Sequence, residues 1–294
     1  MQLNGVIAPV CTPFEGNGEV HFDALRQNIA KYIDAGLKKF VVAGSTGEAP
    51  LLSGTEKRQL FQCVREAADG CVLIAGTGAE SVKETLALVH QATAFDYKAG
   101  LVLTPHFYRS QMSRPGTQAE FFRSVADSSP IPILIYNFPQ MTGIDLLPET
   151  IMQLSEHPNI VGVKESSPDL DRIRKLTSSL PVGFNVIVGA SPKFHESLCL
   201  GVNGGIVAIA NAAPRSTLQV YDRYQLGDVA GSRTAQNKLT DAAGVAARYG
   251  IQGLKYAMDL MGYFGGPSRL PLLPLNDEQK AEIELLFSNV RQEE

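Results

Sequence analysis

The chain has 294 residues, of which 44% are hydrophobic, and its formal net charge at pH 7 is −4. Both signs of charge are mixed along the sequence without a basic block, which argues against a nucleic-acid partner. No apolar run approaches the ~18 residues needed to span a bilayer, and the N-terminus lacks the pattern of a signal peptide. We therefore expect a cytoplasmic protein that has no membrane contact.

Short β-branched runs recur along the first two-thirds of the chain, and each is expected to form a strand. Continuous apolar runs, in place of strict alternation, are typical of parallel strands that are covered on both faces. The runs span residues 5–14, 38–47, 71–78, 99–105, 131–139, 159–167, 184–191 and 203–211.

Segments with helical periodicity lie between several of these runs. The first of them has Gly36 where a helix would stop, and the second has Ser53, Thr55 and Glu56 as candidates for its N-cap. Eight strand–helix units with short connections predict a (β/α)8 barrel of the TIM type. An open doubly wound sheet fits less well, because no G-x-G-x-x-G motif follows the first strand. The expected helices span residues 21–36, 53–69, 81–95, 118–127 and 148–156.

The pattern of strands ends at residue 214. Residues 215–294 have the pattern of helices, with breaks at 249–253, at 262–271 and at Pro274. This stretch is longer than one closing helix requires. We therefore expect a barrel over residues 1–214, and over 215–294 a closing helix with a C-terminal helical extension packed on the barrel.

Lys164 is the most informative residue of the sequence, because it directly follows the buried-strand pattern of residues 160–163. Active sites of TIM barrels lie at the carboxyl ends of the strands, where this lysine falls. Two structural explanations are open: the side chain extends out to solvent, or it forms a buried ion pair with Glu165. The functional alternative is a nucleophile, since burial disfavours the charged form of an amine and a neutral amine forms an imine with a keto group.

Tyr136 ends the strand before that of Lys164, so the two side chains are expected to meet at the barrel mouth. A phenol beside an amine can move protons while a C–C bond is made or cleaved. The alternative is a tyrosine that only completes the core and finds one hydrogen bond.

The segment "GSTGE" (44–48) places Ser45 and Thr46 between glycines at the end of the second strand. One interpretation is a tight turn in which a hydroxyl caps the next helix. The other is a site where backbone N–H groups and hydroxyls bind the carboxylate of a 2-oxo acid.

Other chemically interesting residues carry weaker signals. His106 has no partner at metal-ligand spacing, and the four scattered cysteines are expected to be reduced thiols, so we predict neither a metal site nor an organic cofactor. Arg109 and Arg114 follow the fourth strand and are candidates for binding a substrate carboxylate.

Four motifs occur together in one order, each at the end of a predicted strand. In this combination the chain resembles the pyruvate-dependent class I aldolases of the dihydrodipicolinate synthase and N-acetylneuraminate lyase superfamily, from about residue 5 to 290. The motifs are "GSTGE" (44–48), "TPHFY" (104–108), "YNFPQMTG" (136–143) and "GVKES" (162–166).

The resemblance implies roles for individual residues. Lys164 matches the Schiff-base lysine and Tyr136 the general acid–base tyrosine, while Ser45 and Thr46 match the pair that binds the pyruvoyl carboxylate, with Thr46 in the proton relay. The expected substrate-binding set is completed by residues at the ends of the last three strands: Ser166, Gly189 and Ile206. The resemblance also implies a homotetramer that needs no metal or organic cofactor.

Two positions depart from the pattern of the dihydrodipicolinate synthases. Met141 stands where these enzymes typically carry an arginine that holds the carboxylate of the aldehyde substrate, and a thioether cannot replace a guanidinium. Phe107 stands where many members have a relay tyrosine. Tyr108 follows it and is a candidate for the relay at an offset of one residue.

Stretches of the chain resemble 4-hydroxy-2-oxoglutarate aldolase of the mitochondrial type most closely. The sequence therefore favours cleavage of 4-hydroxy-2-oxoglutarate to pyruvate and glyoxylate. One alternative is 4-hydroxy-tetrahydrodipicolinate synthase, which condenses pyruvate with aspartate semialdehyde, and another is a non-catalytic barrel that binds a 2-oxo acid. The stretches span residues 108–113, 129–136, 154–166 and 248–272.

Overall fold

Eight parallel strands form a closed barrel in the computed structural model, which describes residues 1–292 and 294. Each strand pairs with its neighbours in chain order, and β8 pairs with β1 to close the sheet. The predicted (β/α)8 barrel is confirmed, and every strand falls inside one of the predicted runs. The strands are β1 (Gly5–Pro9), β2 (Lys39–Val42), β3 (Val72–Gly76), β4 (Ala99–Leu103), β5 (Ile133–Asn137), β6 (Ile160–Glu165), β7 (Asn185–Val188) and β8 (Gly204–Ile206).

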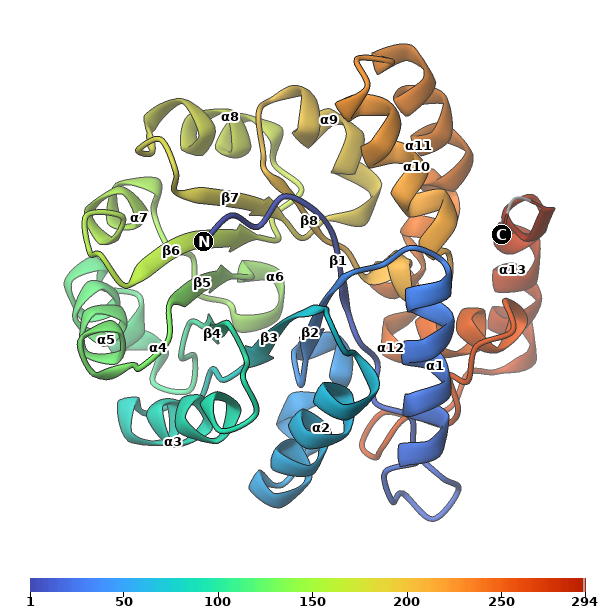
Figure 1. Ribbon diagram of the computed structural model, residues 1–294, viewed down its shortest axis with the longest axis horizontal. Coiled ribbons are helices and arrows are strands. Elements are labelled where there is room, and N and C mark those ends of the chain that lie inside the picture. Colours follow the sequence, from blue (N-terminus) through green and yellow to red (C-terminus); the bar gives the residue numbers. More distant parts are fainter. Residues whose placement is uncertain (293) are drawn as a thin grey trace.

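Helices surround the strands and cover the outside of the barrel (Figure 1). The α-helices of this ring are α1 (Phe22–Asp34), α2 (Gly54–Ala67), α3 (Val82–Thr93), α5 (Pro115–Ser128), α7 (Pro148–Leu154), α8 (Leu170–Ser179), α9 (Phe194–Cys199) and α10 (Pro214–Gln225). Two four-residue helices, α4 (Arg109–Met112) and α6 (Pro139–Thr142), lie on the loops after β4 and β5. Short 3-10 helices are η1 (Ser45–Gly47), η2 (Ala49–Leu51), η3 (Ser191–Lys193), η4 (Ala208–Asn211) and η5 (Val290–Gln292).

Local signals in the sequence set the helix ends. α2 begins with a capping box, in which the Ser53 hydroxyl accepts from the Glu56 N–H and the Glu56 carboxylate accepts from the Ser53 N–H. Thr55, the third capping candidate, lies inside the helix. α1 ends two residues before Gly36, whose φ of +106° lies in the region that favours glycine.

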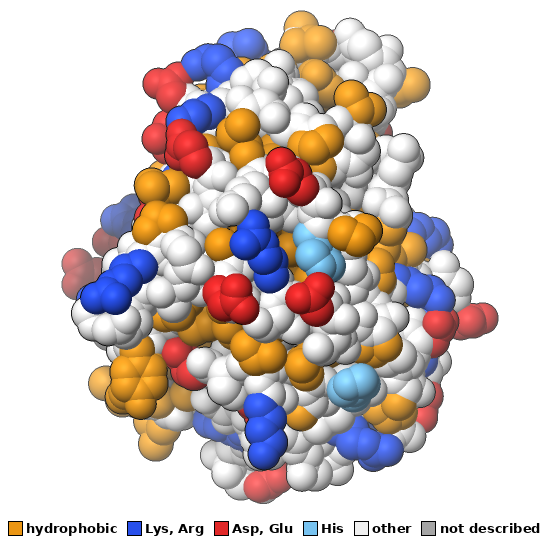
Figure 2. Space-filling view, turned by 90° about the vertical axis from the view of Figure 1, so that its left-hand side faces the viewer, with side chains coloured by type: hydrophobic (Ala, Val, Ile, Leu, Met, Phe, Trp, Pro, Cys, Tyr) orange, Lys and Arg blue, Asp and Glu red, His pale blue; other side chains and the backbone are white. Residues whose placement is uncertain are grey.

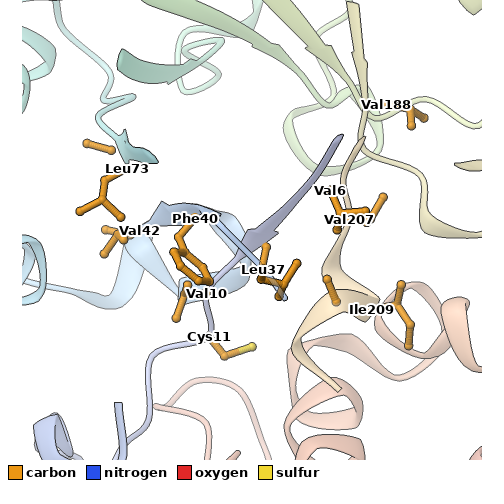
Figure 3. Close-up of a cluster of buried hydrophobic side chains, with 14 of the residues drawn as sticks. Val6, Val10, Cys11, Leu37, Phe40, Val42, Leu73, Val188, Val207 and Ile209 are labelled. Atoms are coloured by element: carbon orange, nitrogen blue, oxygen red, sulfur yellow. The ribbon is translucent and has the colours of Figure 1, made fainter. Parts of the chain in front are cut away.

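The strands alternate between two apolar layers. Residues that face the inside of the barrel form one buried cluster, which includes Ile7, Val41, Leu134 and Tyr136. Their neighbours along the strands face outward and pack under the helices, as Figure 3 shows for Val6, Phe40 and Val42 among others. Because successive side chains of a strand point to opposite faces, this alternation decides which polar residues enter the barrel.

The C-terminal residues form a helical extension on one side of the barrel (Figure 1). It consists of α11 (Val229–Ala243), α12 (Val245–Leu260) and α13 (Asp277–Phe287). α12 runs through the predicted break at 249–253, which appears as a kink at Gly250, where φ is 71° and ψ is −167°. α10 contacts both β1 and α11, so the division of the chain at residue 214 stays a prediction.

The distribution of surface charge and the state of the cysteines fit the mixed charges and the scattered cysteines of the sequence. Acidic and basic side chains are interspersed with hydrophobic ones on the face that Figure 2 shows. No helix within the described residues is long and apolar enough to cross a membrane. All four cysteines are free thiols; Cys199 is exposed, whereas Cys11, Cys63 and Cys71 are buried as expected.

Candidate active site

Lys164 and Tyr136 meet inside the barrel. The two residues are paired in register at the carboxyl ends of β6 and β5. The Lys164 side chain follows the outward-facing Val163 and therefore points inward, and the residue is only 5% exposed. Its Nζ atom lies 3.9 Å from the centroid of the Tyr136 ring, and the Phe138 ring stacks on that ring at 5.8 Å.

The two structural explanations for Lys164 do not hold. At 5% exposure its ammonium group does not extend into solvent. Glu165 does not pair with it either, because the next residue of a strand faces the other way and its carboxylate accepts from Arg172 Nε at 2.7 Å. No ion pair of Lys164 occurs within residues 1–292 and 294, so its amine is buried without a neighbouring carboxylate.

A polar network behind this pair was missed by the sequence analysis. Asn137 and Glu165 follow Tyr136 and Lys164 along their strands and therefore face the helices. The Asn137 amide donates to Glu165 Oε2 at 2.9 Å and to Asp145 Oδ1 at 3.0 Å, and Arg172 of α8 contacts both carboxylates.

This network includes a buried carboxyl group. Burial raises the pKa of the Glu165 carboxyl above its ordinary value, although Arg172 and the hydrogen bonds to Glu165 oppose the shift. The alternation of side chains along β6 could have predicted this pair. It points Glu165 outward, where a buried carboxylate needs a cation, and the helix that follows β6 supplies Arg172.

Gly189 lets the side chains of Ser166 and Lys164 pack directly against its backbone. A Cβ atom at this glycine would lie 1.9 Å from Ser166 Oγ and 3.1 Å from Lys164 Cε. Ser166 is buried, and Ile206 belongs to the interior cluster that contains Tyr136. The structure therefore brings these three predicted residues close to Lys164 or Tyr136 in the barrel interior.

Ser45 and Thr46 lie on η1, immediately after β2. The turn is held by Thr12, whose hydroxyl donates to the Gly47 carbonyl at 2.7 Å. Gly47 has no room for a side chain, because a Cβ atom would lie 2.9 Å from the Val10 carbonyl oxygen. No hydrogen bond joins the Ser45 or Thr46 hydroxyl to Tyr136 in the described part of the chain.

The predicted relay residue Tyr108 lies on the rim and is 69% exposed. Its ring packs edge-on against that of Phe107, with centroids 5.2 Å apart. The structure does not bring Tyr108 to Tyr136, and its role in a relay stays a prediction.

Met141 and Arg109 lie on the loops after neighbouring strands. Met141 is 61% exposed on α6, after β5. Arg109 begins α4, after β4, and its guanidinium covers Gly143: a Cβ atom there would lie 2.9 Å from Arg109 Cζ. Arg109 therefore contacts the loop that carries Met141, the residue that stands where the family pattern has an arginine.

His106 is explained by a surface contact. Its Nδ1 atom lies 3.1 Å from Glu80 Oε1, and Glu80 also accepts from the His106 and Phe107 N–H groups. Within the residues that the structure describes, no group of three or more His, Cys, Asp or Glu side chains is placed to hold a metal ion.

A closed (β/α)8 barrel with a buried lysine and tyrosine at the ends of adjacent strands defines the class of barrel aldolases. Comparison with known proteins identifies the family: the chain belongs to the Dihydrodipicolinate synthetase family, which matches residues 2–290. It is thus an enzyme of the pyruvate-dependent class I aldolase type, whose members bind pyruvate through a lysine Schiff base without an external cofactor.

Individual relatives agree with this assignment. The chain is 32% identical over 285 residues to a 4-hydroxy-tetrahydrodipicolinate synthase of Methanothrix thermoacetophila, covering 96% of this chain and 95% of the relative. The structure of dihydrodipicolinate synthase from Thermotoga maritima matches with a TM-score of 0.93 and 28% identity, covering 99% of both chains. The chloride-inhibited enzyme from Acinetobacter baumannii, in complex with pyruvate, matches with a TM-score of 0.93 and 28% identity, covering 98% of both.

These comparisons correct one expectation. The predicted kinship to 4-hydroxy-2-oxoglutarate aldolase is not supported, because the relatives described above are dihydrodipicolinate-type synthases. The longest stretch that suggested it, 248–272, lies largely in α12 and the loop after it, away from the residues that meet at Lys164. That stretch is structural and carries little information on the substrate.

Proposed function

We propose that this enzyme joins pyruvate to an aldehyde through an imine on Lys164. The observation that carries the proposal is the buried Lys164 amine, which lies 3.9 Å from the Tyr136 ring and has no carboxylate partner among the described residues. An amine that is not engaged by a carboxylate is available to attack a keto group and form an imine.

The proposed reaction assigns one task to each group. The Lys164 amine attacks C2 of pyruvate, and loss of water leaves an iminium ion. Loss of a proton from the methyl group gives an enamine, which attacks the aldehyde carbon. Water then cleaves the new imine, releases a keto acid and restores Lys164; where the aldehyde carries an amine, as aspartate semialdehyde does, that amine condenses with the freed keto group, which closes a ring and releases water. Tyr136 moves the protons that accompany the addition and the loss of water.

The carboxylate of pyruvate is proposed to bind at η1. Ser45 and Thr46 offer hydroxyl groups and backbone N–H groups there, and these donors suit a carboxylate. Because Gly189 lets Ser166 approach Lys164, the Ser166 hydroxyl is proposed to contact the imine.

For the aldehyde we propose aspartate semialdehyde, which makes the protein a 4-hydroxy-tetrahydrodipicolinate synthase like the relatives that it resembles. This substrate carries its own carboxylate, and Met141 offers no charge to hold it. Arg109 is the replacement that the geometry supports, because its guanidinium lies against Gly143, two residues from Met141 on the same loop.

A second candidate is supported by Met141 itself. Without arginine at this position the site also suits cleavage of 4-hydroxy-2-oxoglutarate, which releases pyruvate and glyoxylate. Both candidates use the same imine on Lys164 and differ only in the aldehyde.

One experiment tests the shared chemistry. The protein is incubated with pyruvate and borohydride, and its peptides are weighed. A pyruvate adduct on the peptide that contains Lys164 is expected; an unmodified peptide would rule out the proposal. Condensation with aspartate semialdehyde and cleavage of 4-hydroxy-2-oxoglutarate are then measured side by side, and the faster reaction identifies the substrate.

The role of Arg109 is tested with a matched pair of variants. Arg109→Gln is expected to raise KM for the aldehyde about tenfold, the loss typical of one charge-assisted contact, and to leave pyruvate binding unchanged. Arg123→Gln makes the same chemical change on α5, outside the barrel, and is expected to leave KM close to that of the unaltered enzyme.

We also propose, from the resemblance, that the protein is a cytoplasmic homotetramer. Light scattering coupled to size-exclusion chromatography measures the assembly directly. A monomeric or dimeric mass at micromolar concentration would contradict the tetramer.

A further inference from the structure

Glu48 follows the Ser45–Thr46 turn directly and has an unusual backbone. Its φ of 58° lies in the left-handed region that non-glycine residues rarely adopt, and Ala43, before the turn, has a φ of 56°. The turn that carries both predicted carboxylate-binding hydroxyls is therefore strained on both sides. Such a conformation persists only where other contacts hold it.

The contact that holds Glu48 comes from the C-terminal extension. The Glu48 side chain is buried, and its Oε1 atom lies 2.5 Å from Nζ of Lys255, a residue of α12 that is only 1% exposed. Oε1 accepts no hydrogen bond from the other described residues, so its charge is balanced by the lysine. Lys255 also donates to the Pro267 carbonyl at 2.9 Å.

The second carboxylate oxygen of Glu48 is held from the same extension. Oε2 accepts from the Arg269 N–H at 2.9 Å. The Arg269 side chain in turn pairs with Glu56 of α2 at 2.5 Å and donates to the Leu51 carbonyl at 2.7 Å. Both cations face the ring of Phe14, with Lys255 Nζ and Arg269 Cζ each 4.4 Å from its centroid.

Stability alone does not explain this arrangement. A buried ion pair gains little stability relative to apolar side chains of the same volume, because both charges lose their hydration. Its directional contacts do fix a single backbone conformation. Here the conformation that is fixed is that of the strained turn after β2.

We propose that Glu48 and Lys255 are positioning residues, which hold the turn of Ser45 and Thr46 in the shape that binds the carboxylate of pyruvate. The C-terminal extension then contributes to pyruvate binding, in addition to packing on the barrel. This inference rests on the proposed function, since it assigns the turn to pyruvate.

The test separates pyruvate binding from chemistry. Glu48→Gln and the double variant Glu48→Gly/Lys255→Met are titrated with pyruvate, and the borohydride-trapped fraction is measured by mass. Each is expected to need about tenfold more pyruvate for half-maximal trapping, as misplaced binding groups do. The trapping rate at saturating pyruvate is expected to stay within about twofold, because Lys164 and Tyr136 are untouched.

The double variant guards against loss of the fold. It leaves no buried charge without its partner, and glycine adopts the positive φ of position 48 without strain. Asn159→Ala is the control, because it removes hydrogen bonds to the Ala126 and Ser129 carbonyls at the amino end of β6, far along the strand from Lys164. Its half-maximal pyruvate concentration is expected to match that of the unaltered protein.

The outcomes are distinguishable. If the unaltered protein traps no pyruvate, the proposed function fails, and this inference fails with it. If it traps pyruvate and the folded double variant does so at the same concentration, only the positioning role is overturned. An equal rise in Asn159→Ala would also overturn it, because the effect would then follow any loss of stability.

Discussion

Lys164 and Lys255 are both buried lysines that face an aromatic ring, yet their surroundings differ in one decisive respect. Lys255, on the C-terminal extension, has Glu48 Oε1 at 2.5 Å and the Pro267 carbonyl at 2.9 Å. Lys164, inside the barrel, lies over the Tyr136 ring. The carboxylate of the next residue, Glu165, pairs with Arg172 and not with Lys164.

The difference shows how one residue type serves two purposes. A buried ammonium ion that is paired and hydrogen-bonded is a fixed structural cation. A buried amine that is left unpaired is available for chemistry. The alternation of the strand points Glu165 away from Lys164, and its carboxylate instead binds Arg172 of α8 and Asn137 of β5.

The largest effect is expected from removing the unpaired lysine. Lys164→Met should abolish imine trapping and lower the condensation rate at least about a thousandfold, as loss of a nucleophile does. The denaturation midpoint should change little, since no ion pair of the described residues is broken. Lys175→Met, on the exposed side of α8, is the control and should keep full activity. A pyruvate adduct trapped in Lys164→Met would show that Lys164 is not the reactive lysine and would contradict the comparison with Lys255.

Removal of the paired lysine should act on stability. Lys255→Met leaves the Glu48 carboxylate buried without its partner, which is expected to lower the free energy of unfolding by about 3–5 kcal/mol. Urea denaturation followed by circular dichroism measures this loss. Adding Glu48→Gln to the same chain should recover part of it. If Lys255→Met is as stable as the unaltered protein, the pair does not hold the fold as the contrast requires.

Tyr136→Phe sharpens the chemical side of the comparison. The ring under Lys164 stays in place, so the lysine remains buried and the stability should be nearly unchanged. Loss of the hydroxyl is expected to lower kcat about a hundredfold, within the range for general acid–base groups. Trapping of pyruvate by borohydride should still occur, but more slowly. An unchanged kcat would assign proton transfer to another group.

The smallest effect concerns the other cation of the extension. The hydrogen bond from Arg269 lowers the pKa of Glu56 to about 2, from 4.5. A carboxyl with a depressed pKa in the folded state stabilises the protein above pH 4.5, and this contribution is lost as the pH falls toward 2. Because the pair is partly exposed, we expect it to contribute only about 1–2 kcal/mol.

Glu56→Gln measures this contribution. The variant should be less stable than the unaltered protein at pH 7, and the difference in urea midpoint should shrink steadily below pH 4.5. A difference that is constant from pH 7 to pH 3 would show that the charge of Glu56 is not responsible, because glutamine keeps the capping hydrogen bond to the Ser53 N–H.

The barrel could be predicted because its information is local. Each strand is a short apolar run bounded by Gly, Pro or Asn, and each central helix has its own polar face and end signals. The short helices α4 and α6 could not be predicted, since four residues carry no periodicity. The break expected at 249–253 is found at Gly250, whose non-helical backbone separates two helical parts of α12.

The candidate site was predictable where strand ends identify it. Lys164 and Tyr136 stand out as polar residues at the ends of apolar runs. Arg172 does not, because an arginine on an amphipathic helix has the sequence pattern of a solvated residue. Glu48 and Lys255 carry no local signal of each other, so only the folded chain reveals their contact.

The contacts of Glu48 also set an order of events during synthesis. Arg269, whose N–H binds the Glu48 carboxylate, lies 221 residues further along the chain. At the usual speed of translation the turn after β2 is made roughly 10–45 s before that partner leaves the ribosome. Until Lys255 and then Arg269 are made, the Glu48 carboxylate lacks its partners from the extension. In a nascent chain of this kind the eight-stranded sheet can close well before the C-terminal extension holds the turn of Ser45 and Thr46.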